Sequence, residues 1–363
     1  MNKLSIKIID NDAELHDLQN AWGHLDEQCK DTSIFSSYTY VSTAWKYSKN
    51  ESDKLFILLL SDREKVVGIA PLRITEKRYL GINARVIRYI AEFEGDKPEL
   101  LALDEKAVWE RIADFLSYEF EQWDVITLME QTDPSNIFRD CFRKPGYIYE
   151  EMIDSRSYSV SLNESWDNFY SSLSRNVKKN WRRRYNKLNK EHTDINIEYV
   201  NDSNAIDSAL DRFIQLEHSG WKKDAHIGVG KDETHRQFYL ELLKGLSSKQ
   251  NVSLAFLKVG DTDIAGDIIY SYKGKLYDRQ TAYNPHYAEY SPGIILLSEI
   301  IKHYMERKYD EMDLQGLEPG NPKKLHSMEW STSAVETKRQ TIYRKYSRVF
   351  PFVGLKQIKH ALT

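Results

Sequence analysis

The sequence predicts two similar α/β domains in tandem, and three observations support this fold class. The chain has 363 residues, enough for two domains at roughly 150 residues each. Strand-sized apolar runs alternate with amphipathic stretches of helical period. A strand, a charged turn and a glycine-bearing return strand occur at 55–74 and again at 253–272, an offset of 198 residues. We therefore expect domains at 1–150 and 151–345 and a tail at 346–363.

The two halves have similar orders of elements, each with a hairpin that helices precede and follow. Leu15, Leu18, Trp22 and Leu25 share one face of a helix, and Leu55 begins a buried strand. Strand, helix, hairpin, helix and strand are expected at 4–9, 13–29, 55–74, 106–122 and 123–128. Two helices, a hairpin, a strand, a helix and a strand are expected at 204–219, 232–247, 253–272, 276–282, 293–307 and 311–314.

Composition excludes several classes of protein. The 51 Lys and Arg against 55 Asp and Glu give a net charge of −4, so the chain is not a generally basic nucleic-acid binder. Cys29 and Cys141 form neither a disulfide framework nor a zinc pattern. The N-terminus lacks a signal-peptide pattern, and apolar runs such as 55–60 are too short for a transmembrane segment. We expect a cytoplasmic protein.

One segment is strongly basic. Eight of the sixteen residues at 175–190 are Lys or Arg and none is acidic, after a plausible N-cap at Ser174. The apolar residues with helical spacing that would dock this helix are Val177, Trp181, Tyr185 and Leu188. Because like charges repel along a helix, an anionic partner at Lys178 and Arg182 is expected: a nucleotide cofactor, a tRNA, an acidic glycan or a lipid head group. A solvated face balanced by acidic neighbours is the alternative.

A second feature is the junction from a predicted strand to a predicted helix. The polar loop that ends at Tyr290 leads into Ser291, Pro292 and Gly293. Serine suits the N-cap and proline the first helical turn, while glycine permits close approach to the backbone. The free N–H groups of such a helix start favour an anion such as a pyrophosphate.

Together these features resemble the Gcn5-related N-acetyltransferase (GNAT) fold, and more closely its tandem Fem-like branch with the CelD-type acetyltransferase-like domain. The likeness covers most of 30–335. Its motifs are 175–190, Glu217-His218-Ser219-Gly220-Trp221-Lys222, Ile264-Ala265-Gly266, Tyr283-Asn284-Pro285 through Ser291-Pro292-Gly293, and the Asp313 strand with its lysine-bearing loop. The first half matches through Phe35-Ser36-Ser37 with Trp45 and through Val66 to Leu72.

The resemblance implies a mixed, mostly antiparallel sheet flanked by helices in each domain. It implies acyl transfer to an amine from acetyl-CoA or another acyl-CoA, or from an aminoacyl-tRNA as in the Fem branch. The donor would lie at Ser291, Pro292, Gly293 and Ile294. Of the family's usual Gln/Arg-x-x-Gly-x-Gly/Ala phosphate loop only Gly293 is present, and Pro292 removes one N–H donor.

Attack of an amine on a thioester needs a base, polarisation of the carbonyl and a proton for the thiolate. Asp278, His286 and Glu217 are the candidate bases, and Tyr283 or Tyr290 could protonate the leaving group. No cysteine is well placed for a covalent relay, so direct transfer is expected.

Further residues would bind substrates. Trp221 and Lys222 would shape the acceptor pocket. The family pattern expects a lysine after a glycine-bearing turn near the C-terminal end, which Lys323 or Lys324 could supply. His218 beside Glu217 lacks the HExxH pattern, so no metal is expected.

Three functions stay open at this point. One is an acyl-CoA-dependent N-acyltransferase acting on an amino sugar, peptide or amino-acid derivative. The second is an aminoacyl-tRNA-dependent transferase that extends a peptide. The third is a non-catalytic GNAT-like protein that binds a glycan or partner in polysaccharide biosynthesis or export. A monomer or a homodimer would suit each.

Overall fold

The structure, a computed structural model, describes residues 4–79, 81–132, 136–220, 226–317, 326–351 and 353. It divides into two compact units. Unit 1 comprises Met1–Ser155 and Glu336–Thr363, and unit 2 comprises Arg156–Val335. The chain crosses this boundary twice, inside two long strands, β7 (Tyr147–Ser161) and β13 (Ser333–Arg344).

Unit 1 is built on a mixed sheet with the order β1-β2-β3-β4-β6-β13. The pair β4 and β6 is parallel, and the other neighbours are antiparallel. A two-residue strand, β5 (Leu101–Ala102), pairs with β3. The bounds are β1 Ser5–Ile9, β2 Lys54–Asp62, β3 Lys65–Tyr79, β4 Ile82–Tyr89 and β6 Val125–Gln131.

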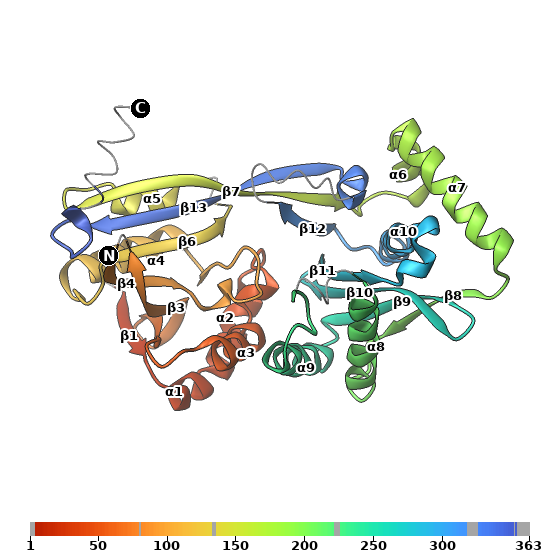
Figure 1. Ribbon diagram of the computed structural model, residues 1–363. Coiled ribbons are helices and arrows are strands. Elements are labelled where there is room, and N and C mark those ends of the chain that lie inside the picture. The colour runs from red at the N-terminus through yellow and green to blue at the C-terminus, as the bar shows by residue number, and fades with distance from the viewer. Residues whose placement is uncertain are drawn as a thin grey trace. The chain divides into compact units, whose positions relative to one another are not determined.

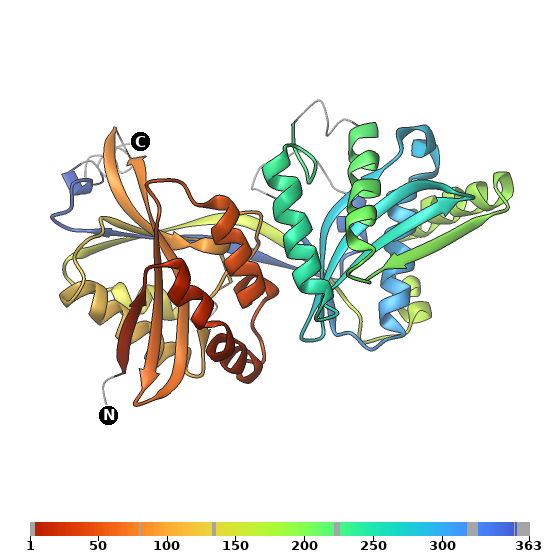
Figure 2. The ribbon, with the colours of Figure 1, turned by 90° about the horizontal axis from the view of Figure 1, so that it is seen from below.

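Helices cover the unit 1 sheet (Figures 1 and 2). The connection from β5 to β6 is α4 (Glu105–Tyr118), which buries Val108, Ile112 and Leu116 in a core with β2, β3 and β6. Gly68 on β3 lets this helix approach, because a Cβ there would lie 2.7 Å from a Val108 methyl group. The remaining helices are α1 Asp12–Asp17, α2 Gln19–Gln28, η1 Ile34–Ser36, α3 Tyr38–Ser48, η2 Ile90–Glu92 and α5 Ile137–Phe142.

Unit 2 repeats this plan with the strand order β7-β12-β11-β10-β9-β8. Here β11 and β12 are the parallel pair, and the pairs from β11 to β8 and from β12 to β7 are antiparallel. The bounds are β8 Ile195–Val200, β9 Val252–Val259, β10 Thr262–Tyr272, β11 Lys275–Tyr283 and β12 Glu311–Leu317.

The unit 2 sheet is covered on both faces. In Figure 1, α8 (Ile206–Ser219) and α9 (Glu233–Ser247) lie on one side, and α10 (Pro292–Met305) lies on the other beneath α7 (Arg175–Glu191). The α10 core contains Ala265, Ile269 and Ile300, and Trp181 of α7 packs against it. The remaining helices are α6 Trp166–Ser172, η3 Pro285–Tyr290 and η4 His326–Trp330.

The predicted fold class, two α/β units with mixed sheets flanked by helices, is confirmed. The boundaries differ from the prediction at the C-terminal end. Residues 336–345, expected in the second domain, belong to unit 1 because β13 pairs with β6. Of the predicted tail 346–363, residues 346–351 and 353 are described, and they too belong to unit 1.

The two hairpins also differ from the predicted overlay by one residue. Their turns, which hold Arg63 and Gly260 at φ 56° and 57°, are offset by 197 residues rather than 198. Because alternate strand residues face opposite sides of a sheet, the two glycines point different ways. Gly68 faces α4, whereas a Cβ on Gly266 would meet Leu216 and Phe213 of α8.

Candidate functional site

The parallel pair β11 and β12 separates soon after it starts. Only three residue pairs are made, from Lys275–Tyr277 to Glu311–Asp313. Beyond them β11 continues to Tyr283, paired with β10 on its other edge. We call the region where the two strands part the strand split. The Gln315 side chain of β12 crosses it, because its Nε2 donates to the carbonyl oxygens of Asp278 and, at 2.6 Å, of Arg279.

The start of α10 lies over the end of β11. A Cβ built on Gly293 would be 3.6 Å from the Thr281 methyl group. Ser291 holds the N-cap position at φ 50° without a side-chain capping bond, and the first turn contains no acidic residue. The Ile294 amide donates to the Ser291 carbonyl at 3.0 Å, and no backbone carbonyl among the described residues accepts the Gly293 amide. Among the described residues, the Gly293 amide at this uncapped helix start therefore has no acceptor.

Two buried carboxyl groups lie under this helix start. Asp267 on β10 is 1% exposed and Asp278 on β11 is 8% exposed. The Thr281 hydroxyl lies 3.3 Å from an Asp267 carboxyl oxygen and 3.4 Å from one of Asp278. Burial raises the pKa of Asp278, while its hydrogen bond with Asp267 partly offsets that effect. The structure thus places a carboxyl group of raised pKa beside a second buried carboxyl group under the start of α10.

A β-bulge brings these side chains together. The pairing of β10 with β11 shifts between Ile268 and Ile269, so Arg279 is an extra residue on β11. Asp278 and Thr281, three positions apart, therefore fall on the same face instead of opposite faces. That face is the α10 side, since Ala265 and Ile269 flank Asp267 in the alternating strand and belong to the α10 core.

Two predicted residues stand near the exit from β11, outside the buried pair. Tyr283, the last residue of β11, is 41% exposed. His286 is exposed on η3, and its backbone amide donates to the Asn284 side chain. Both therefore lie on the short segment that connects β11 to α10. Tyr290, at the end of that segment, donates its hydroxyl to a Glu191 carboxylate.

Glu217 has a different setting. It is 2% exposed near the end of α8, on the opposite face of the sheet from Asp278. Its carboxylate accepts the Gly230 amide at 3.1 Å, and a Cβ on Gly228 would collide with it. The structure thus shows Glu217 holding the loop after α8. Trp221, Lys222, Lys323 and Lys324 lie outside the described residues.

The basic segment forms α7 as predicted, capped by Ser174, whose hydroxyl accepts the Val177 amide at 3.3 Å. Trp181 fixes the helix to α10 by donating to the Ser298 hydroxyl at 2.9 Å. Lys178 donates to the Ser171 carbonyl at 2.7 Å, and the Arg182 guanidinium lies 5.2 Å from the Tyr170 ring centre. Four further exposed cations have no ion pair among the described residues: Arg175, Lys179, Arg183 and Lys190.

Sequence reasoning found Asp278 and the helix start but missed Asp267, Thr281 and Gln315. A signal for Asp267 was present, because it is an acidic residue inside the apolar return strand 264–272. Its closeness to Asp278 depends on the β-bulge, which cannot be predicted from the sequence. Across the described ranges, no cluster of three His, Cys, Asp or Glu side chains could hold a metal ion, and no helix could span a membrane.

Comparison with known proteins finds a family model that matches a large segment of unit 2. Residues 175–321 match the family model described as acetyltransferase (GNAT) domain. This segment contains α7, the buried carboxyl pair, the strand split and the start of α10. The chain therefore carries a GNAT-type acetyltransferase domain. No curated protein matches the sequence.

Solved structures share the fold over both units. FemX is 11% identical with a TM-score of 0.62, over 92% of this chain and 97% of that one. The C-terminal DUF2156 domain of an Agrobacterium fabrum protein assigned as a lysylphosphatidylglycerol synthetase is 10% identical with a TM-score of 0.54, over 89% and 92%. L-PGS from Bacillus licheniformis is 13% identical with a TM-score of 0.50, over 94% of each chain. At these identities the likeness is one of fold.

Proposed function

We propose that the chain is an N-acyltransferase that moves an acyl group from acyl-CoA to an amine by direct attack. The acceptor class is an amino sugar, a peptide or an amino-acid derivative, and the reaction is placed in the cytoplasm, where acyl-CoA is made. The donor would lie at the strand split and the start of α10 in unit 2.

The observation that carries this proposal is the strand split beneath an uncapped helix start. Gln315 occupies the carbonyls of Asp278 and Arg279, and beyond them the unpaired edge of β11 presents backbone groups to an extended ligand. The pantetheine arm of CoA has amide groups that can pair with such an edge. The free Gly293 amide and the positive end of the α10 dipole suit its pyrophosphate.

The residues around the split suit a direct transfer. The amine attacks the thioester carbonyl carbon, the C–S bond breaks, and the departing thiolate takes up a proton. We assign that proton to the Asp267–Asp278 pair, because burial favours the protonated form of Asp278. His286, exposed on the segment after β11, is the group we assign to accept the proton of the amine.

An aminoacyl-tRNA donor is the second candidate, and α7 favours it. Arg175, Lys179, Arg183 and Lys190 are exposed cations without ion pairs among the described residues. Such a face gives the salt-dependent phosphate contacts on which nucleic-acid binding rests. Binding of tRNA that weakens steeply with salt and with loss of these cations would support this donor over acyl-CoA.

A pair of substitutions at one position tests the acyl-CoA proposal. Gly293→Trp should abolish acetyl-CoA binding measured by calorimetry, because an indole would fill the space between α10 and Thr281. Gly293→Ala is the matched control, since its Cβ makes ordinary contact at 3.6 Å and alanine favours the helix. Equal acetyl-CoA affinity of Gly293→Trp and the unchanged protein would overturn the placement of the donor at the start of α10. Absence of binding by the unchanged protein would favour the tRNA donor or a non-catalytic binding role.

A further inference from the structure

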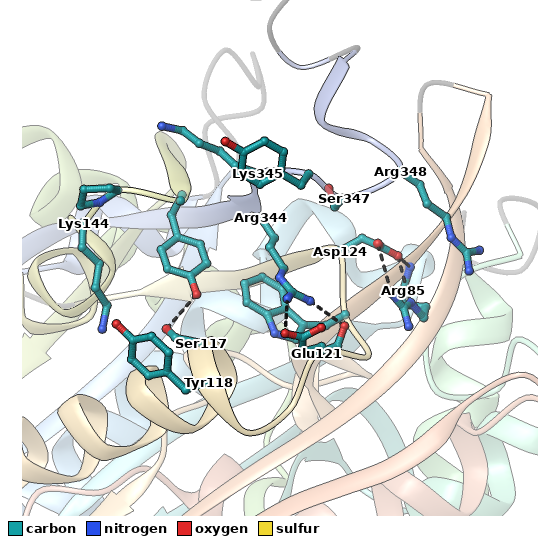
Figure 3. Close-up of a pocket in the computed structure, with 15 residues that line it drawn as sticks. Arg85, Ser117, Tyr118, Glu121, Asp124, Lys144, Arg344, Lys345, Ser347 and Arg348 are labelled. Atoms are coloured by element: carbon teal, nitrogen blue, oxygen red, sulfur yellow. Dashed lines mark hydrogen bonds and ion pairs between the residues drawn. The ribbon is translucent and has the colours of Figure 1, made fainter.

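Unit 1 contains a cavity of about 600 Å³, within the size range of small-molecule sites. Its walls come from β4, the end of α4 and its connection to β6, the turn before β7, and the residues that follow β13. Figure 3 shows this pocket, with several basic side chains around it. All of its lining residues belong to unit 1.

Part of the charge in this pocket is neutralised internally. Arg85 donates through Nε to Asp124 at 3.1 Å and through a terminal nitrogen at 3.3 Å. Arg344 forms an ion pair with Glu121 at 3.3 Å. Among the described residues of the pocket wall, Glu121 and Asp124 are the only carboxylates, and both are paired with arginines.

Two further cations in the wall remain unmatched. Lys345 and Arg348 have no ion pair among the described residues. Arg348 lies close enough to Asp124 to help lower the pKa of that carboxyl, although Arg85 holds it directly. Between them, the Ser347 hydroxyl is buried without a hydrogen-bond partner in the described structure. In Figure 3, Lys345 and Arg348 extend in opposite directions from the segment after β13, so this segment offers Arg348 and the Ser347 hydroxyl to an anion.

The same pocket exposes two aromatic rings. Tyr346 is 95% exposed and Tyr118 is 75% exposed, and no other large apolar or aromatic side chain in the described ranges is as exposed as either. Tyr346 also has a φ of 66°, a backbone conformation that costs free energy in a residue with a side chain. The Tyr346 ring centre lies 6.4 Å from that of Phe350. The rest of the ring faces solvent and can stack on a planar or sugar ring.

We propose that this pocket binds an organic phosphate monoester whose ring stacks on a tyrosine, such as a nucleoside or hexose monophosphate. A phosphate monoester carries between one and two negative charges near pH 7, which suits a site that contains Arg348. Arg348 and Ser347 bind the phosphate, and Tyr346 and Tyr118 contact the ring. This site is separate from the proposed acyl transfer in unit 2.

Calorimetry on the full chain tests the proposal with AMP, glucose 1-phosphate, adenosine and inorganic phosphate. At least one ester should bind at least tenfold tighter than inorganic phosphate and adenosine, because only the esters use both charge and ring. Tight binding of AMP alone identifies a nucleotide ligand, and tight binding of glucose 1-phosphate alone identifies a sugar phosphate. Failure of both esters to exceed inorganic phosphate would overturn the proposal.

Variants locate the binding. Arg348→Gln should weaken the ester about tenfold, the loss expected for one charge-assisted hydrogen bond. Arg175→Gln removes an equally exposed cation on α7 and should change nothing. Gly293→Trp should also leave ester binding intact, since it alters unit 2. Equal weakening by Arg348→Gln and Arg175→Gln, or loss of binding in Gly293→Trp, would place the ligand elsewhere and contradict the assignment.

Discussion

The two units differ most where their parallel strands separate. In unit 1, β4 pairs with β6 only through Val86 and Ile87. Beyond this pairing, β6 is held by residues 96–98 of the loop that follows β4. Gln131 of β6 donates to the Pro98 carbonyl at 2.9 Å, and Glu130 hydrogen-bonds Asp96. In unit 2 the bridge is a single side chain, Gln315, reaching from β12 to β11.

The helix that connects the two parallel strands, α4 in unit 1 and α10 in unit 2, also differs in how it starts. Helix α4 starts with an acidic residue, Glu105, behind the Asp104 cap, whose carboxylate accepts the Ala107 amide at 3.0 Å. Helix α10 starts at Pro292 with no acidic residue in its first turn and no side-chain cap. Unit 1 thus places carboxylates at its helix start, whereas unit 2 has no acidic residue and no side-chain cap there, which suits an anion.

The largest effect is expected when the unit 1 helix start is copied into unit 2. Ser291→Asp places a carboxylate at the start of α10 and should weaken acyl-CoA binding at least tenfold by repelling its phosphates. Ser291→Asn is the matched control, because Asn and Asp both tolerate the left-handed backbone seen there. Calorimetry should show weaker acyl-CoA binding by Ser291→Asp than by Ser291→Asn. Equal affinities would contradict the difference between the two helix starts.

Gly68, which packs against α4, should tolerate a side chain less well than Gly293 at the start of α10. Gly68→Ala should lower the free energy of unfolding by about 1–3 kcal/mol, because its Cβ would lie 2.7 Å from a methyl group of the stiff Val108. Urea denaturation measures this loss. Gly293→Ala, with a contact of 3.6 Å, should cost nothing measurable. A Gly68→Ala protein as stable as the unchanged one would show that α4 shifts freely.

The stability of unit 1 should depend on pH through Glu130, which lies in β6 beyond its pairing with β4. Burial, followed by the Asp96 charge, raises the pKa of Glu130 from 4.5 to about 8. Between these values the folded chain holds a proton that the unfolded chain has released, so stability falls as the pH rises from 5 to 9.

Glu130→Gln removes that proton linkage while keeping the shape of the side chain. Urea midpoints at pH 6 and pH 9 should therefore lie closer together in the variant than in the unchanged protein. A pH dependence identical in the two proteins would show that Glu130 does not titrate in this range.

The smallest effect concerns the helix caps. Asp104→Ala should cost about 1 kcal/mol of stability, the usual value of an N-cap side chain. Ser291→Ala should cost much less, because the Ser291 side chain makes no capping bond. Thermal unfolding of the two variants makes this comparison, and equal losses would contradict the difference between the helix starts.

Much of this contrast could be predicted from the sequence. The apolar runs and turns located the hairpins β2–β3 and β9–β10, and the Ser291-Pro292-Gly293 tripeptide located the start of α10. Local patterns suffice for such elements because their partners are near in the chain. The β6–β13 pairing was not predictable, since it joins Val125 to Tyr343 across all of unit 2.

The candidate site was found only in part for the same reason. Asp278 stood out as an acidic residue on a strand, but its partner Asp267 reaches it through a bulge that depends on the register of two strands. The bridge made by Gln315 depends on a backbone φ of 67° and on where β11 and β12 separate. Neither feature leaves a pattern in the residue types.

Hydrogen–deuterium exchange with and without acetyl-CoA tests the central claim, that the acyl carrier engages the split and helix start of unit 2. Acetyl-CoA should slow exchange at Gly293 and along residues 278–283 of β11. The start of α4 at 104–107 should be unchanged. Protection at the α4 start without protection at Gly293 would contradict the account.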